Sequence, residues 1–130
     1  VDIDDSGALI GSSPPNWLLL IAGNTIQVRA GSATIYVMGG ALFTAGESNL
    51  ISLSRVGNVV TAYVNGVALT DTETVNPTDT FSADRLLQRG TNGNPYDEPV
   101  SEIIIYDSDQ SANRPAIEAN IANQYNLTLS

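Results

Sequence analysis

The sequence predicts an all-β protein, an antiparallel sandwich of short strands that ends in one short helix. Turn-forming Gly, Pro and Asn residues recur at strand-length intervals, and the segments between them are rich in Val, Ile, Thr, Leu and Tyr. The pattern changes near the C-terminus, where apolar residues become spaced four apart, as on one face of a helix. The chain has 130 residues, enough to bury its own core, so a single domain over residues 1–130 is predicted.

Seven segments are the predicted strands, because each is rich in β-branched, Leu or Tyr residues and is bounded by turn signals. They span residues 17–22, 25–29, 34–38, 49–56, 59–65, 85–89 and 100–106. The acidic residues 1–7 are expected to be a frayed lead-in, and the Thr-rich residues 70–80 are expected to form a loop.

The best-defined unit is a β-hairpin around the Gly57-Asn58 turn. A two-residue turn at this position pairs residues 51–56 with residues 59–64, which places alternate side chains on opposite faces. The apolar face is predicted to belong to the core and carries Ile51, Leu53, Val60, Ala62 and Val64, with Arg55 at its end. The polar face is expected to be a solvated sheet face or a shallow groove and carries Ser52, Ser54, Thr61 and Tyr63.

The C-terminal helix is predicted to begin at Ser111, whose hydroxyl can cap it, and to place Ile117, Ile121 and Tyr125 on one apolar stripe. Pro115 falls in the first turn, where its missing N–H costs no hydrogen bond. The strand before the helix is apolar on both faces, so the helix is expected to cover one of them. One core is therefore predicted, built from Ile51, Leu53, Val64, Ile103, Ile105 and Ile121.

The composition excludes several classes of function. Five Arg and no Lys stand against fourteen acidic residues, for a formal net charge of -9, so binding to nucleic acid or to an anionic membrane is not expected. No signal peptide or membrane span is recognised in the sequence. The absence of Cys excludes a disulfide scaffold and thiolate metal sites.

Three parts of the sequence carry a resemblance to a known family. The run ISLSRVGNVVTAYVNG at residues 51–66 is followed by SEIIIYD at residues 101–107 and by the predicted helix at residues 111–125. Together they resemble the laminin-G-like or concanavalin A-like jelly-roll modules of phage virion proteins and bacterial exoproteins. The resemblance covers residues 48–126 and implies an antiparallel jelly-roll β-sandwich with one short C-terminal helix.

The sequence also departs from that family. Its modules usually have further strands before the position of residue 17, where this chain offers only residues 1–11. The departure implies a trimmed sandwich, or one that a neighbouring chain completes, with residues 1–11 as a pairing or linker segment. In addition, Glu98-Pro99 replaces a Gly that the family places shortly before the strand containing Glu102.

Catalysis is not expected from this set of residues. Nucleophilic triads need a His or Lys base, and the sequence contains neither. Glycosidases use two carboxylates across the scissile bond, and the members with this fold carry closely spaced acids on one strand. Here Glu102 is alone in its strand, while Asp107 and Asp109 lie in a turn. We therefore expect no enzymatic activity.

The loop at residues 89–98 holds the candidate binding residues. An aromatic ring flanked by amides and carboxylates is typical of a glycan site, and an ordinary long loop has the same composition. The glycan candidates are Asn92, Asn94, Tyr96, Asp97 and Tyr63. Calcium binds several oxygen ligands from converging loops. Asp97 and Glu98 are therefore the candidate metal ligands, and calcium is the cofactor they would bind.

Two functions are left open by these observations. The first is a non-enzymatic structural module on a virion surface, such as a phage capsid decoration, fibre or tail component, that assembles as a homo-oligomer or with other virion proteins. The second is a glycan-binding adhesion module of a larger exported bacterial protein, with a cell-surface glycan as its ligand. Both place the chain on a virion surface or outside the cell.

Overall fold

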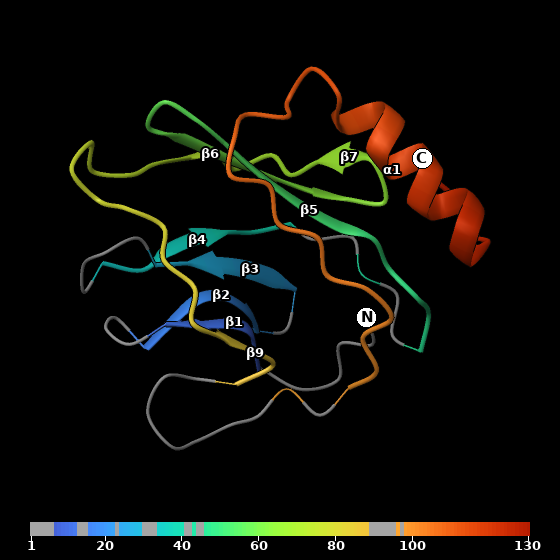
Figure 1. The fold of residues 1–130 in the computed structure, drawn as a ribbon, viewed down its shortest axis with the longest axis horizontal. Helices are drawn as coiled ribbons and strands as arrows, with labels where there is room; N and C mark the ends of the chain where they lie inside the picture. Colours follow the sequence, from blue (N-terminus) through green and yellow to red (C-terminus); the bar gives the residue numbers. More distant parts are fainter. Residues whose placement is uncertain are drawn as a thin grey trace.

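The fold consists of two antiparallel sheets that face each other, with one helix beside them (Figure 1). The computed structural model describes residues 7–12, 16–22, 24–29, 34–40, 43, 46–88, 96 and 98–130. Its elements are β1 (Gly7–Ser12), β2 (Asn16–Ala22), β3 (Thr25–Val28), β4 (Tyr36–Met38), β5 (Ile51–Val56), β6 (Val59–Val64), β7 (Val67–Ala68), β8 (Glu73–Thr74), β9 (Arg85–Leu86) and α1 (Arg114–Tyr125). The prediction of an all-β sandwich with one short C-terminal helix is confirmed.

The first sheet has the strand order β4-β3-β2-β1-β9, so β1 is an inner strand that pairs with β2 on one side and with β9 on the other. The prediction that residues 1–11 pair outside the domain is therefore wrong for residues 7–11, and residues 1–6 lie outside the described residues. Gly11 allows this pairing, because a Cβ at its position would overlap the backbone oxygen of Gln88.

The second sheet has the order β5-β6-β7, and β8 pairs with β6 as well. The hairpin of β5 and β6 has the predicted register, from Val56 opposite Val59 to Ile51 opposite Val64. β7 follows through a tight turn in which Asn65 has a φ of 49° and Gly66 a φ of 88°. Asn65 also ties this turn to the start of β5, because its Oδ1 accepts a hydrogen bond of 2.8 Å from the backbone N–H of Leu50.

The core lies between the two sheets. Ile21, Ile26 and Met38 of the first sheet are fully buried, and Val60 and Val64 of β6 contribute from the second. The apolar hairpin face is thus turned to the core as predicted, with Ile51 and Leu53 half-buried at its edge. The core prediction is wrong for Ile105, whose side chain is 62% exposed.

The run at residues 100–106 forms no strand, contrary to the prediction. It crosses the open side of the sandwich in front of β5, irregular in conformation (Figure 1). The β-branched residues of this run favour a strand, but no pairing of the run with either sheet exists among the described residues. Ile104 and Tyr106 consequently join Ile105 as exposed hydrophobic side chains.

The helix α1 begins later than predicted, because its N-cap is Asn113 and Ser111 lies in the preceding turn. There the backbone N–H of Ser111 donates to Oδ1 of Asp109 at 2.8 Å. The predicted stripe of Ile117, Ile121 and Tyr125 is only half-buried, whereas the buried helix residues are Glu118 and Ala122. Among the described residues, no helix has the length and apolarity to cross a membrane.

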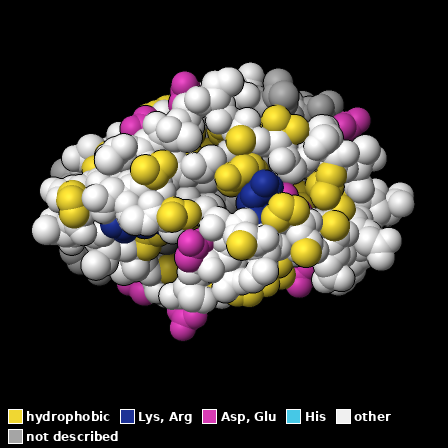
Figure 2. All heavy atoms as spheres, turned by 90° about the horizontal axis from the view of Figure 1, so that it is seen from above, with side chains coloured by type: hydrophobic (Ala, Val, Ile, Leu, Met, Phe, Trp, Pro, Cys, Tyr) yellow, Lys and Arg dark blue, Asp and Glu magenta, His cyan; other side chains and the backbone are white. Residues whose placement is uncertain are grey.

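Hydrophobic side chains reach the surface of the molecule over the helix-bearing side. Figure 2 shows them from above, gathered around a basic side chain, with acidic side chains mostly toward the periphery.

Candidate functional site

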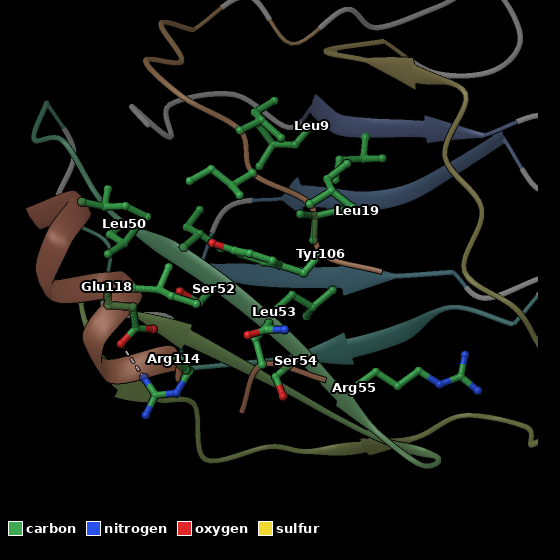
Figure 3. A pocket seen from close by; sticks show the side chains of 18 of the residues that line it. Leu9, Leu19, Leu50, Ser52, Leu53, Ser54, Arg55, Tyr106, Arg114 and Glu118 are labelled. Carbon is green, nitrogen blue, oxygen red and sulfur yellow. Dashed lines mark hydrogen bonds and ion pairs between the residues drawn. The ribbon is translucent and has the colours of Figure 1, made fainter. Parts of the chain in front are cut away.

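The candidate site is a groove of about 810 Å³ that follows the open edge of β5 (Figure 3). Three parts of the chain line it: residues 49–55, the irregular residues 102–111, and the first turns of α1. Leu9 and Leu19 of the first sheet complete its apolar surface. Side chains from both faces of β5 line the groove, because β5 pairs only with β6 and its other edge is open among the described residues.

A partly buried ion pair lies at the helix end of the groove. Nη1 of Arg114 donates to Oε2 of Glu118 at 2.5 Å, one helical turn away. The Glu118 side chain is only 3% exposed, and its Oε1 is buried without a hydrogen-bond partner. The Arg114 guanidinium lies 3.7 Å from the ring centre of Tyr63, so this contact joins α1 to the hairpin. This end of the groove therefore has one unused buried acceptor.

The opposite end of β5 carries Arg55 (Figure 3). Its Nε donates to the carbonyl of Gly57 at 3.0 Å and its Nη1 donates to the carbonyl of Asp79 at 2.7 Å. The guanidinium also lies 4.9 Å from the ring centre of Phe81. Arg55 is therefore held by neutral partners near the hairpin turn, away from the helix.

Three exposed carboxylates, those of Glu102, Asp107 and Asp109, line the groove between these two ends. None of them forms an ion pair within the described part of the chain. The hydrogen bonds from the backbone and side chain of Ser111 lower the pKa of Asp109 below its ordinary value. Negative charge therefore collects on the wall of the groove that faces β5.

Of the predicted glycan residues, only Tyr96 and Tyr63 are among the described residues, and they lie in different parts of the fold. Tyr96 is only 5% exposed and lies against Gly7 of β1, where a Cβ would come within 2.7 Å of its ring. Its ring is therefore not available to stack on a sugar. Tyr63 belongs to the other sheet, and one face of its ring is covered by Arg114. The remaining candidates, Asn92, Asn94 and Asp97, lie outside the described residues.

The candidate calcium ligands are only partly described. Glu98 is half-buried and does not line the groove, and Asp97 lies outside the described residues. Within the described part, no three His, Cys, Asp or Glu side chains are placed to hold a metal ion.

Two groove residues escaped the sequence reasoning. Glu118 was not singled out, although Arg114 and Glu118 stand four apart on the predicted helix, a spacing that signals an ion pair. Tyr106 was placed in a covered strand, because a run of three Ile residues before it is typical of a buried strand. No local signal marks its exposure, which depends on the path of residues 100–106 across the sandwich.

Comparisons of the chain with protein-family models, with curated proteins and with solved structures return no match.

Proposed function

We propose that the chain is a non-enzymatic structural module, displayed on a surface, that acts by assembling with copies of itself or with other proteins. One observation carries this proposal: hydrophobic side chains are exposed next to an unpaired strand edge, with Ile104 45%, Ile105 62% and Tyr106 49% exposed. Proteins rarely leave such surface uncovered, because open apolar edges recruit other chains.

A phage virion component, such as a capsid decoration, fibre or tail protein, is the setting we propose. The resemblance of residues 51–66 and 101–107 to laminin-G-like or concanavalin A-like modules supports it, and the two antiparallel sheets with a closing helix agree with that architecture. The absence of His and Lys from the sequence supports a role without acid–base or nucleophilic catalysis.

Assembly is tested by sedimentation velocity of the full chain over a wide concentration range. We expect oligomers that dissociate when Ile104 and Ile105 are both replaced by Ser, because these substitutions remove exposed apolar surface and leave the core intact. Val67→Ser is the matched control, since Val67 is 37% exposed in β7, outside the groove. A chain that remains monomeric throughout, with no effect of any substitution, would contradict the proposal.

The non-enzymatic part is tested with polysaccharide, ester and peptide substrates. We expect no turnover above background. Hydrolysis of a polysaccharide that disappears in a Glu102→Gln variant would show that the groove is catalytic.

Glycan adhesion is a second candidate, favoured by Tyr106. Its half-exposed ring lines the groove together with Asp107 and Gln110, which is the combination that stacks on a sugar and binds its hydroxyls. A glycan array distinguishes this function: binding that is lost in Tyr106→Ala and retained in Tyr96→Phe would support it.

A further inference from the structure

We propose that the groove along β5 binds an extended polypeptide segment of a partner protein, in which apolar residues alternate with Lys or Arg. The inference rests on the proposed function and names the partner with which the module assembles. Three properties of the described residues specify such a segment: an open strand edge, an apolar lining and negative charge without ion pairs.

The open edge of β5 favours an extended peptide. An unpaired strand edge presents a row of N–H and C=O groups that a further strand can pair with, the mode of binding known as β-augmentation. The hydroxyls of Ser52 and Ser54 on the same strand make no hydrogen bond among the described residues. β5 therefore offers polar groups for a peptide backbone along its length.

The lining requires an apolar face on that peptide. Leu9, Leu19 and Leu53 line the groove on the side of β5 that faces the core. Successive side chains of a strand point to opposite faces, so a peptide with apolar residues at alternate positions places them all on one side. Water in the groove would be displaced by those side chains, which favours binding.

The charge of the groove decides between a basic partner and a second copy. Glu102, Asp107 and Asp109 are exposed there without ion pairs, whereas Glu118 already balances Arg114. A second copy of the chain would bring another net charge of -9 toward these carboxylates, so self-association through this surface is weaker than the binding of a basic segment. A segment with Lys or Arg at its other alternate positions meets them with opposite charge.

Binding is tested by fluorescence anisotropy with labelled synthetic peptides of about ten residues, the length of a long strand. One peptide alternates Val and Lys, a second alternates Val and Glu, and a third alternates Ser and Lys. We expect the Val–Lys peptide to bind the full chain about tenfold more tightly than either of the others. If the Ser–Lys peptide binds as tightly as the Val–Lys peptide, the binding is only nonspecific electrostatic attraction, and the inference is overturned.

A matched pair of variants locates the binding site. Glu102→Gln with Asp107→Asn removes two groove charges, and Asp71→Asn with Glu73→Gln removes two charges outside the groove. The first pair is expected to lower the affinity for the Val–Lys peptide about fivefold, and the second pair is expected to lower it less than about twofold. Equal effects of the two pairs would overturn the inference.

A single variant tests the apolar lining of the groove. Ile104 lies at an exposed position, so Ile104→Ser is expected to weaken binding without lowering the melting temperature. If the peptide does not bind but the chain still self-associates in a way that depends on Ile104, the occupant of the groove is a second copy of the chain. That result would overturn this inference and leave the proposed function standing.

Discussion

Replacing Ile26 by Ala is expected to lower the free energy of unfolding by about 3–4 kcal/mol. Ile26 lies in β3 directly between Ile21 of β2 and Met38 of β4, and all three side chains have 0% exposure. Removal of three buried carbon atoms costs about 2.4 kcal/mol at ~0.8 kcal/mol each. The cavity left in this row supplies the rest, because strands paired on both sides cannot collapse into it.

The same truncation at Ile105 provides the contrast. Its side chain is 62% exposed, so Ile105→Ala is expected to cost less than about 0.5 kcal/mol. Urea denaturation, followed by far-UV circular dichroism and by the fluorescence of Trp17, measures both variants. A cost above about 2 kcal/mol for Ile105→Ala would show that residues 100–106 form a core strand, as the sequence pattern suggests. A cost below about 1 kcal/mol for Ile26→Ala would refute the burial of the row in β2, β3 and β4.

Three further results are expected. Arg114→Met should destabilise the fold by about 3 kcal/mol, because it leaves the Glu118 carboxylate buried and unpaired. The double variant with Glu118→Leu should recover most of that loss. Additive effects of the two substitutions on the free energy of unfolding would refute the pairing. Gly11→Ala should cost about 1–3 kcal/mol because its Cβ would overlap a backbone oxygen, and an unchanged melting curve would contradict the position of β1. The pKa of Asp109 is lowered in the folded chain by its hydrogen bonds from Ser111, so their contribution is complete above the unfolded pKa and is lost as the pH falls through the folded value. Asp109→Asn should remove this pH dependence, and an NMR titration midpoint of the Asp109 carboxyl at or above 3.8 would contradict it.

The features that the sequence determined by itself are local ones. The hairpin of β5 and β6 has the predicted register because the Gly57-Asn58 turn and the alternation of apolar and polar residues act within a few positions of each other. The helix was predictable for a related reason, since Pro115 and the spacing of apolar residues specify a helix over residues that are neighbours in the chain. Its N-cap shifted to Asn113, because several polar residues in the turn compete for that position.

The features that only the tertiary structure decided depend on distant parts of the chain. Residues 7–11 are an inner strand because β2 and β9 supply hydrogen bonds on both sides, and the residues themselves carry no signal of those partners. Tyr96 is buried because it packs against Gly7, although its loop has the composition of an exposed binding loop. Residues 100–106 have strong strand propensity but no paired edge, so they line a groove instead. Propensity is a property of each residue, whereas pairing and burial require a partner elsewhere in the fold, and the position of residues 102–111 beside β5 depends on such partners.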